Sequence, residues 1–152
     1  MTKRYQANSR TYDKRRCSKT EVSLTSSAYE PGTIRHIVLF RYRDDLDGND
    51  LQRIEQKFHE LQTSRRDGHP YILGIESGAQ NSPEGLGQGF HHAYIVSFAS
   101  QGDRNYYVGE PLITNPALYD PVHHAFKSFI APYISDQERS VLVFDFHVPA
   151  QQ

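Results

Sequence analysis

Residues 34–42, IRHIVLFRY, decide the fold of this chain. Side chains at alternate positions point to opposite faces of a β-strand. One face carries Ile34, His36, Val38, Phe40 and Tyr42, and the other carries Arg35, Ile37, Leu39 and Arg41. Both faces contain large apolar side chains, so both need a cover. We therefore predict a strand whose sheet packs against other structure on each side.

The segment after this strand has the pattern of an amphipathic helix. Leu51, Ile54, Phe58 and Leu61 recur at spacings of three, four and three residues, which places them in one stripe. We expect Asn49 or Asp50 to cap this helix, and Gly68 and Pro70 to end it. Further strands are predicted at 71–75, 91–98 and 140–147, a short helix at 103–108, and a helix that begins near Pro121.

This order of elements predicts an α+β fold. Strand, helix, strand, strand, helix and strand follow one another, which favours a ferredoxin-like antiparallel sheet with its helices on one face. The last strand, like the first, has apolar residues on both faces. The helices can cover only one face, so we expect the other to meet a second copy in a homodimer.

Composition and charge limit the other possibilities. The 152 residues suit one domain, and no apolar run approaches the length of a membrane span. The single cysteine, Cys17, cannot form an internal disulfide, which favours the cytoplasm. Net charge is −1, and we expect neither nucleic acid nor a membrane as partner.

The charge is unevenly distributed along the chain. Residues 1–31 contain seven Lys or Arg and three Asp or Glu, whereas the remainder contains ten and fifteen. We predict a basic, flexible extension at 1–31, a folded domain at 32–149 and a tail at 150–152. Organelle targeting and a binding arm are the alternative interpretations of the extension.

The candidates for chemistry are histidines and tyrosines. All eight histidines lie between residues 36 and 147. His36 is predicted on the first strand, His92 on the third strand in the same face as Tyr94, and His123 near the start of a helix that follows Tyr107. A Tyr and a His can share proton transfer, because imidazole titrates near neutral pH and a phenol donates to a developing oxyanion.

Four ordered motifs add a family resemblance. IRHIVLFRYRDD (34–45), SPEGLGQGFHHAYIVSF (82–98), DPVHHAF (120–126) and VLVFDF (141–146) together resemble the stress-responsive dimeric A/B barrel (Dabb) family over residues 33–148. The resemblance implies a ferredoxin-like fold in which two sheets close into a barrel across a dimer. This expectation agrees with the strand pattern but is independent of it.

Within that family, the arrangement is most similar to the plant olivetolic acid cyclase subgroup. That likeness implies a polyketide-like or small aromatic substrate and a reaction without metal or organic cofactor. It also implies His123 and Tyr107 as catalytic residues. The implied substrate-binding positions are His36, Ile54, Phe58, Ile75, His92 and Asp145, and Tyr94 joins them on the face of His92.

The sequence departs from that subgroup at two places. Asp120 stands where the first histidine of the HPxH motif is expected, and residues 109–118 form an extra stretch between Tyr107 and His123. We interpret this stretch as either a lid or a plug. A lid leaves a cavity that reaches both residues, whereas a plug packs Leu112 or Ile113 where a ligand would bind.

Alternatives without catalysis fit the same residues. His36 can be a core histidine bonded to a partner, with Asp145 as the candidate, and His123 can serve the helix start. A metal site would use His36, His92, His123 and Asp145, although their spacing does not favour one. A non-catalytic ligand-binding or structural dimer is therefore the second hypothesis, and a ligand-sized cavity discriminates between the two.

Overall fold

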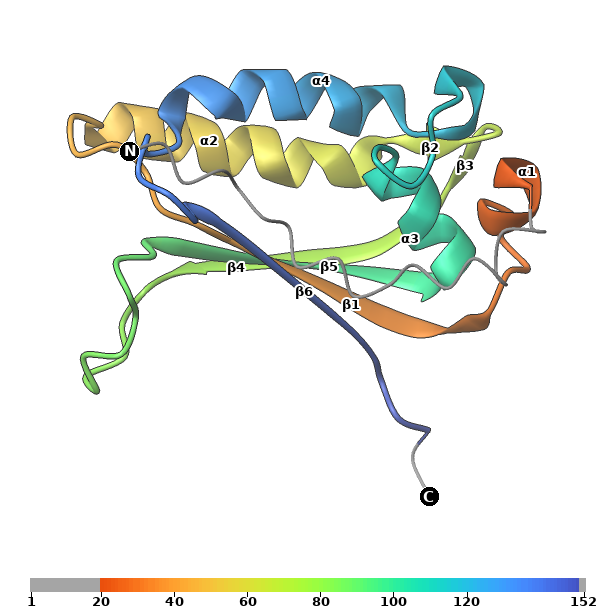
Figure 1. Cartoon of the computed structure of the whole chain (residues 1–152), viewed down its shortest axis with the longest axis horizontal. Helices are drawn as coiled ribbons and strands as arrows, with labels where there is room; N and C mark the ends of the chain where they lie inside the picture. The colour runs from red at the N-terminus through yellow and green to blue at the C-terminus, as the bar shows by residue number, and fades with distance from the viewer. Residues whose placement is uncertain (1–19, 151–152) are drawn as a thin grey trace, which may run out of the picture.

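The computed structural model describes residues 20–150, and its centre is a four-stranded antiparallel sheet. The strands are β1 (Pro31–Phe40), β4 (Ile72–Ala79), β5 (His92–Ser100) and β6 (Val141–His147), in the order β4-β5-β1-β6. Helices α2 (Gly48–Glu60) and α4 (Pro121–Ile130) lie across one face of this sheet (Figure 1). The predicted α+β, ferredoxin-like fold is confirmed.

The alternation in β1 divides the sheet as predicted. Ile34, His36, Val38 and Phe40 are buried beneath the helices, and Tyr42 is buried just beyond the strand, where it bridges to Ile134. Val38, Phe40 and Tyr42 form one core with residues from the helices and from β4 and β5. The intervening residues of β1 are only partly buried.

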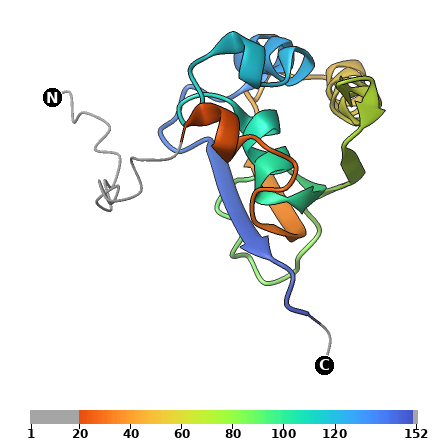
Figure 2. The same cartoon turned by 90° about the vertical axis from the view of Figure 1, so that its right-hand side faces the viewer.

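The opposite face of the sheet is apolar and exposed along β6. Leu142, Phe144 and Phe146 are 43%, 60% and 41% exposed, and they pair with the partly buried Leu39, Ile37 and Arg35 of β1. Figure 2 shows α2 and α4 together on the other side of the sheet. The chain therefore leaves large apolar side chains on the face that its helices do not cover.

Helix α2 begins earlier than the sequence analysis expected. Asp47 is the cap: its carboxyl accepts a hydrogen bond from Asp50 N at 2.8 Å, and the Asp50 carboxyl accepts one from Asp47 N at 3.2 Å. This reciprocal box satisfies two backbone donors at once. The expected cap at Asn49 or Asp50 is therefore wrong.

A small hairpin after α2 was not anticipated. The helix ends at Glu60, a 3-10 turn, η2, spans Leu61–Thr63, and strands β2 (Arg65–Arg66) and β3 (His69–Pro70) then pair. Asp67 and Gly68 form the loop with φ of 50° and 78°. An Asp-Gly pair with two positive φ angles is a strong two-residue hairpin signal. The sequence analysis had used Gly68 only as a helix terminator.

The segment between β5 and α4 contains a helix and a connecting loop. Helix α3 (Gln101–Val108) is capped by Ser100, whose hydroxyl accepts from Asp103 N at 3.0 Å. Two 3-10 turns, η3 (Pro116–Leu118) and η4 (Ala131–Tyr133), flank α4. Pro121 occupies the first turn of α4, as predicted.

Part of the predicted extension packs on the domain. Residues 20–30 form helix α1 (Glu21–Leu24) and a turn against α3, and Thr25 is only 1% exposed. The backbone of Gly102 approaches this turn so closely that a Cβ would lie 1.6 Å from Ser26 O. The other predicted features of the extension, including Cys17, lie outside the described residues, as do 151 and 152.

Candidate functional site

A cavity of about 710 Å³ lies between the helix-facing side of β1 and β6 and a wall made by α3, α4 and the segment after α3. This volume is within the range of small-molecule sites. Most of the lining is apolar. The polar side chains that line it are His36, Arg104, Asn105, Tyr107, Glu110, His123, Lys127 and Asp145.

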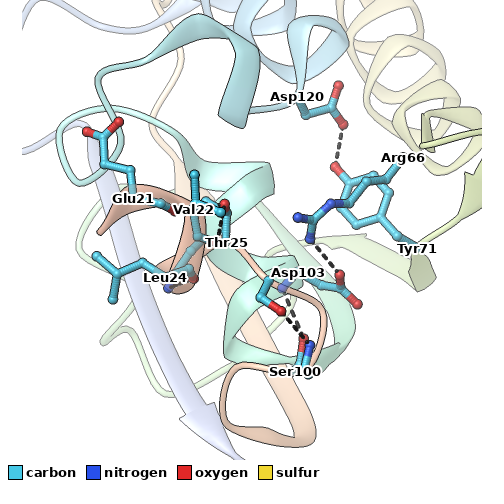
Figure 3. Close-up of polar contacts among 12 residues, drawn as sticks. Glu21, Val22, Leu24, Thr25, Arg66, Tyr71, Ser100, Asp103 and Asp120 are labelled. Atoms are coloured by element: carbon cyan, nitrogen blue, oxygen red, sulfur yellow. Dashed lines mark hydrogen bonds and ion pairs between the residues drawn. The ribbon is translucent and has the colours of Figure 1, made fainter. Parts of the chain in front are cut away.

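His123 lies on the first turn of α4. The cap residue Asp120 accepts hydrogen bonds from Val122 N and His123 N, so it fixes the start of the helix. The Tyr71 hydroxyl donates to the same Asp120 carboxyl (Figure 3). His123 is 9% exposed and faces the cavity.

The hydrogen bond of His123 defines its tautomer. Its Nδ1 lies 2.5 Å from Tyr107 O, and because a carbonyl only accepts, Nδ1 carries the proton. The pKa of His123 is lowered to about 3, chiefly by burial; the bond to Tyr107 O acts in the opposite direction, and the nearby Lys127 charge adds to the lowering. The ring is therefore neutral near pH 7, and Nε2 is an unprotonated acceptor.

Tyr107 comes from the last turn of α3 and stacks on His123. The ring centroids are 3.7 Å apart and the planes differ by 13°. Tyr107 is 1% exposed, and burial, followed by the charge of Asp120, raises the pKa of its phenol. The hydroxyl thus keeps its proton across the physiological range and acts as a donor.

His36 forms the second polar pair of the cavity. Its Nδ1 lies 2.8 Å from Asp145 Oδ1, and Arg104 Nη1 donates to Asp145 Oδ2 at 2.7 Å. Burial raises the pKa of Asp145, but the bonds and charges of His36 and Arg104 outweigh it and hold that pKa below its usual value. The Asp145 carboxylate only accepts, so His36 Nδ1 carries a proton. The predicted His36–Asp145 bond is confirmed.

The stretch at 109–118 forms a wall of the cavity. Glu110, Pro111 and Leu112 line it, and Lys127 Nζ donates to Val108 O at 2.6 Å and to Glu110 O at 3.4 Å. Ile113 is fully buried but is not part of the lining. The cavity still reaches both Tyr107 and His123, which is the arrangement expected of a lid.

The structure separates the predicted substrate-binding residues into two groups. Phe58, His36 and Asp145 line the cavity with the two predicted catalytic residues. The others lie elsewhere: Ile54 and Ile75 are in the core, and His92 and Tyr94 belong to a separate cluster.

The register of the sheet explains the position of His92. His36 pairs with Val96, whereas His92 pairs with Phe40, four residues farther along β1. Four residues of strand correspond to about 13 Å. His92 Nδ1 lies 3.4 Å from the hydroxyls of both Tyr42 and Tyr94, and burial lowers its pKa.

Polar residues near His92 complete this second cluster. His59 Nε2 lies 2.8 Å from Ser77 Oγ, and the Ser77 hydroxyl donates to Glu55 Oε1 at 2.9 Å. Glu55 and His59 are one turn apart on α2, and Ser77 is on β4. The sequence analysis did not anticipate this contact, because it joins two elements whose register was unknown.

Arg104 and Lys127 are two of the cavity residues that sequence reasoning missed. A signal was present, since Arg104 lies three residues before Tyr107 on α3 and Lys127 lies four residues after His123 on α4. Side chains at these spacings share one helix face. When one helix residue is predicted to face the site, the residues three or four positions away on the same helix are therefore candidates to face it too.

A metal cluster and a membrane-spanning helix are both absent from residues 20–150. No group of three or more His, Cys, Asp or Glu side chains there is arranged to hold a metal ion. None of the helices in this part of the chain has the length and apolar character needed to cross a membrane.

Solved structures share this fold at low sequence identity. A hydroxynitrile lyase from Passiflora edulis is 22% identical, with a TM-score of 0.60, over 80% of this chain and 98% of that one. A Dabb family protein with a ferredoxin-like fold from Mesorhizobium loti is 21% identical, with a TM-score of 0.55, over 79% and 99%. A dimeric ferredoxin-like protein of unknown function from Jannaschia is 13% identical, with a TM-score of 0.58, over 77% and 100%.

Sequence comparison identifies the family. No curated protein matches the chain significantly. The family model of the stress responsive A/B barrel domain (Dabb) matches residues 34–148, which is most of the chain and includes the cavity residues of β1, α3, α4 and β6. The chain therefore belongs to the stress responsive A/B barrel (Dabb) family.

Proposed function

We propose that the cavity binds a mainly apolar small molecule that carries a carbonyl group, and that the protein removes a proton from the carbon next to that carbonyl. The observation that carries this proposal is the stack of His123, whose Nε2 is unprotonated, on Tyr107, whose phenol keeps its proton, with both side chains in the lining of one cavity of about 710 Å³. The apolar lining selects the body of the ligand, and the few polar groups orient it.

In the proposed step, His123 Nε2 takes the α-proton. The electrons of the broken C–H bond form the enolate, and its oxygen accepts a hydrogen bond from the Tyr107 hydroxyl. In a polyketide-like substrate, the resulting carbon then attacks a second carbonyl and forms the bond that closes a ring. His123 returns its proton to the new alkoxide, so the side chains end as they began.

The low pKa of His123 is compatible with this role. Burial disfavours an isolated imidazolium, but proton transfer between two neutral groups creates the cation beside the enolate anion. The negative charge therefore stabilises the protonated ring at the moment it forms. Nδ1–H continues to donate to Tyr107 O, which also favours the cation.

His36 is assigned to substrate binding. Its Nδ1–H donates to Asp145, and in the neutral form of the ring its Nε2 is then an acceptor that can bind a substrate hydroxyl, such as that of an enol. Arg104 holds the second oxygen of Asp145 and thereby keeps this pair in place. His36 and Tyr107 also meet edge to face, with centroids 5.6 Å apart.

We also propose that the functional form is a homodimer built on the exposed face of β6. The support is the exposed Leu142, Phe144 and Phe146, together with the description of a structural neighbour as dimeric. Burying such side chains is worth about 1.5–3 kcal/mol each.

Exchange of a ketone α-proton for deuterium tests the proposed chemistry. Butyrophenone in D₂O is the probe, and loss of its α-CH₂ proton signal is followed by NMR. The wild type is expected to accelerate exchange, and His123→Gln to lose about 100- to 10,000-fold of that acceleration. His124→Gln is the matched control, because His124 is exposed on the same helix and does not line the cavity.

A second result would favour the non-catalytic hypothesis. If butyrophenone binds in the cavity but exchanges no faster than in buffer, the protein is a ligand-binding dimer. The hydrogen bonds of His36 and His123 to Asp145 and Tyr107 O would then be structural. Lyase chemistry like that named for the Passiflora neighbour is tested in parallel, with benzaldehyde cyanohydrin as probe.

A further inference from the structure

The cavity wall formed by residues 109–118 is held by a helix from the N-terminal side of the domain. Helix α1 has only four residues, which is too short to be stable without outside contacts. Its cap Thr20 accepts from Ser23 N at 3.1 Å, and the adjacent Thr25 is buried. Figure 3 shows Glu21, Leu24 and Thr25 projecting in different directions from this single turn.

Glu21 makes the most extensive of these contacts. Its Oε1 accepts hydrogen bonds from Thr114 N at 2.7 Å and from Thr114 Oγ1 at 2.8 Å, and its Oε2 accepts one from Asn115 N at 3.0 Å. Three donors converge on one carboxylate across more than ninety residues of sequence. Charge-assisted hydrogen bonds of this kind are stronger than neutral ones.

Helix α1 is itself fixed to the helix that carries the site. Asn105 Nδ2 donates to Leu24 O at 2.8 Å, and Gln101 N donates to Glu30 O at 3.1 Å. Asn105 lines the cavity, and its Oδ1 accepts from Arg104 Nε at 3.0 Å. A position on α1 is therefore a fixed position relative to the cavity.

The wall segment is thus fastened on both sides of Leu112. Its start is held to α4 by Lys127, which donates to Glu110 O and to the adjacent Val108 O, and its middle is held by Glu21 through Thr114. Leu112, which faces the cavity, lies between these two fastenings. Ile113 is fully buried and anchors the same stretch through apolar contact.

We propose that Glu21 is a positioning residue that sets the size of the cavity and, with it, the length of ligand that the protein accepts. This inference rests on the proposed function, because it takes the cavity to be the ligand site. Without Glu21 the wall keeps its buried Ile113 and its bonds to Lys127, but it loses the polar fastening at Thr114 and Asn115. The wall segment then moves away from the cavity, and the cavity becomes larger. Long ligands fit better as a result, whereas short ligands lose contacts with the wall.

A series of aryl ketones tests this assignment. Acetophenone, butyrophenone, hexanophenone and octanophenone add methylene groups to one carbonyl-bearing body, and calorimetry gives the dissociation constant for each. Glu21→Ala is expected to shift the ratio of octanophenone to acetophenone affinity about tenfold toward the longer ketone. Glu21→Gln, which keeps one acceptor oxygen, is expected to fall between it and the wild type.

Val22→Ala is the matched control, because Val22 lies on the same helix and is 65% exposed. It is expected to keep the wild-type length preference. If Glu21→Ala weakens all four ketones by the same factor, or changes none of them, the assignment of cavity size to Glu21 is wrong. A purely stabilising role predicts one of those two results.

Amide hydrogen exchange separates this inference from the proposed function. In Glu21→Ala, exchange at Thr114 N and Asn115 N is expected to become faster, while exchange in β5 stays unchanged. If the wild type binds no ketone, the proposed function is contradicted. The exchange data then test only whether Glu21 holds the wall segment in place. Faster exchange confined to 109–115 supports this role, and unchanged exchange overturns it.

Discussion

The imidazole of His123 lies flat on the phenol ring of Tyr107, and its Nδ1–H donates to the backbone carbonyl of that same residue. Two helices thereby meet through one pair of residues, since Tyr107 is on the last turn of α3 and His123 is on the first turn of α4. The stack fixes the plane of the imidazole, and the hydrogen bond fixes its tautomer. Nε2 is left as the acceptor, and this atom is central to the predictions below.

The first prediction concerns the charge of His123. The folded pKa of about 3 lies below the ordinary 6.5, so between these values the unfolded chain binds a proton that the folded chain does not. The free energy of unfolding should therefore rise with pH across this window and level off above it. His123→Gln should remove that part of the pH dependence, as measured by urea unfolding at several pH values.

Nitrogen chemical shifts of the His123 ring provide an independent readout. The ring should remain neutral, with the proton on Nδ1, from about pH 8 to about pH 5. A His123 ring that becomes protonated near pH 6.5 would contradict the burial effect, and a neutral ring with its proton on Nε2 would contradict the tautomer assignment.

The second prediction concerns the phenol of Tyr107. Tyr107→Phe should slow the deuterium exchange of butyrophenone about 10- to 100-fold, because the enolate oxygen loses its donor. The dissociation constant should change much less, since the ring and its stack on His123 remain. Tyr106→Phe is the control, as Tyr106 packs on Arg66 outside the cavity lining. Equal rates in both variants would remove Tyr107 from the mechanism.

The third prediction concerns Asp145, which joins His36 and Arg104. Asp145→Asn should lower the free energy of unfolding at neutral pH by about 1–3 kcal/mol, because two charge-assisted bonds lose their anion. The folded pKa of Asp145 is depressed, so its contribution is present above the ordinary value of 3.8 and is lost as pH falls below it. Wild type and variant should therefore converge in acid. A difference that persists at low pH would show that the charge is not its source.

The fourth prediction concerns assembly. Sedimentation at micromolar concentration should show a dimer that buries more than about 1,000 Å² in total. Phe144→Asp should weaken it, because that side chain is 60% exposed on the uncovered face. Glu84→Gln, in an exposed loop, should leave it unchanged. A wild type that sediments only as a 17.5 kDa species would contradict this prediction.

The fold could be predicted because its signals are local. The alternation of buried and less buried residues lies within β1, and the apolar stripe of Ile54 and Phe58 lies within α2. The burial of each agrees with the prediction. The hairpin at 65–70 was missed for a related reason. Gly68 favours a turn and ends a helix equally well, and only the preceding Asp67 distinguishes the two.

The candidate site was predictable only in part, because it depends on register. His36 and Asp145 are direct partners across β1 and β6, which the sequence analysis had given only as a candidate contact, because two strand patterns do not fix the register between them. His92 pairs with Phe40 instead, and no periodicity within β5 reveals that offset. The contact of Glu21 with Thr114 joins the four-residue helix α1 to a loop, and sequence patterns within such short segments give no spatial information.

A crystal structure of the protein with butyrophenone bound tests the central claim most directly. The account predicts the phenyl ring against the apolar wall, the ketone oxygen within hydrogen-bonding distance of the Tyr107 hydroxyl, and the α-carbon about 3–3.5 Å from His123 Nε2. A ketone bound only on the exposed face of Phe144 and Phe146, with none in the cavity, would contradict it.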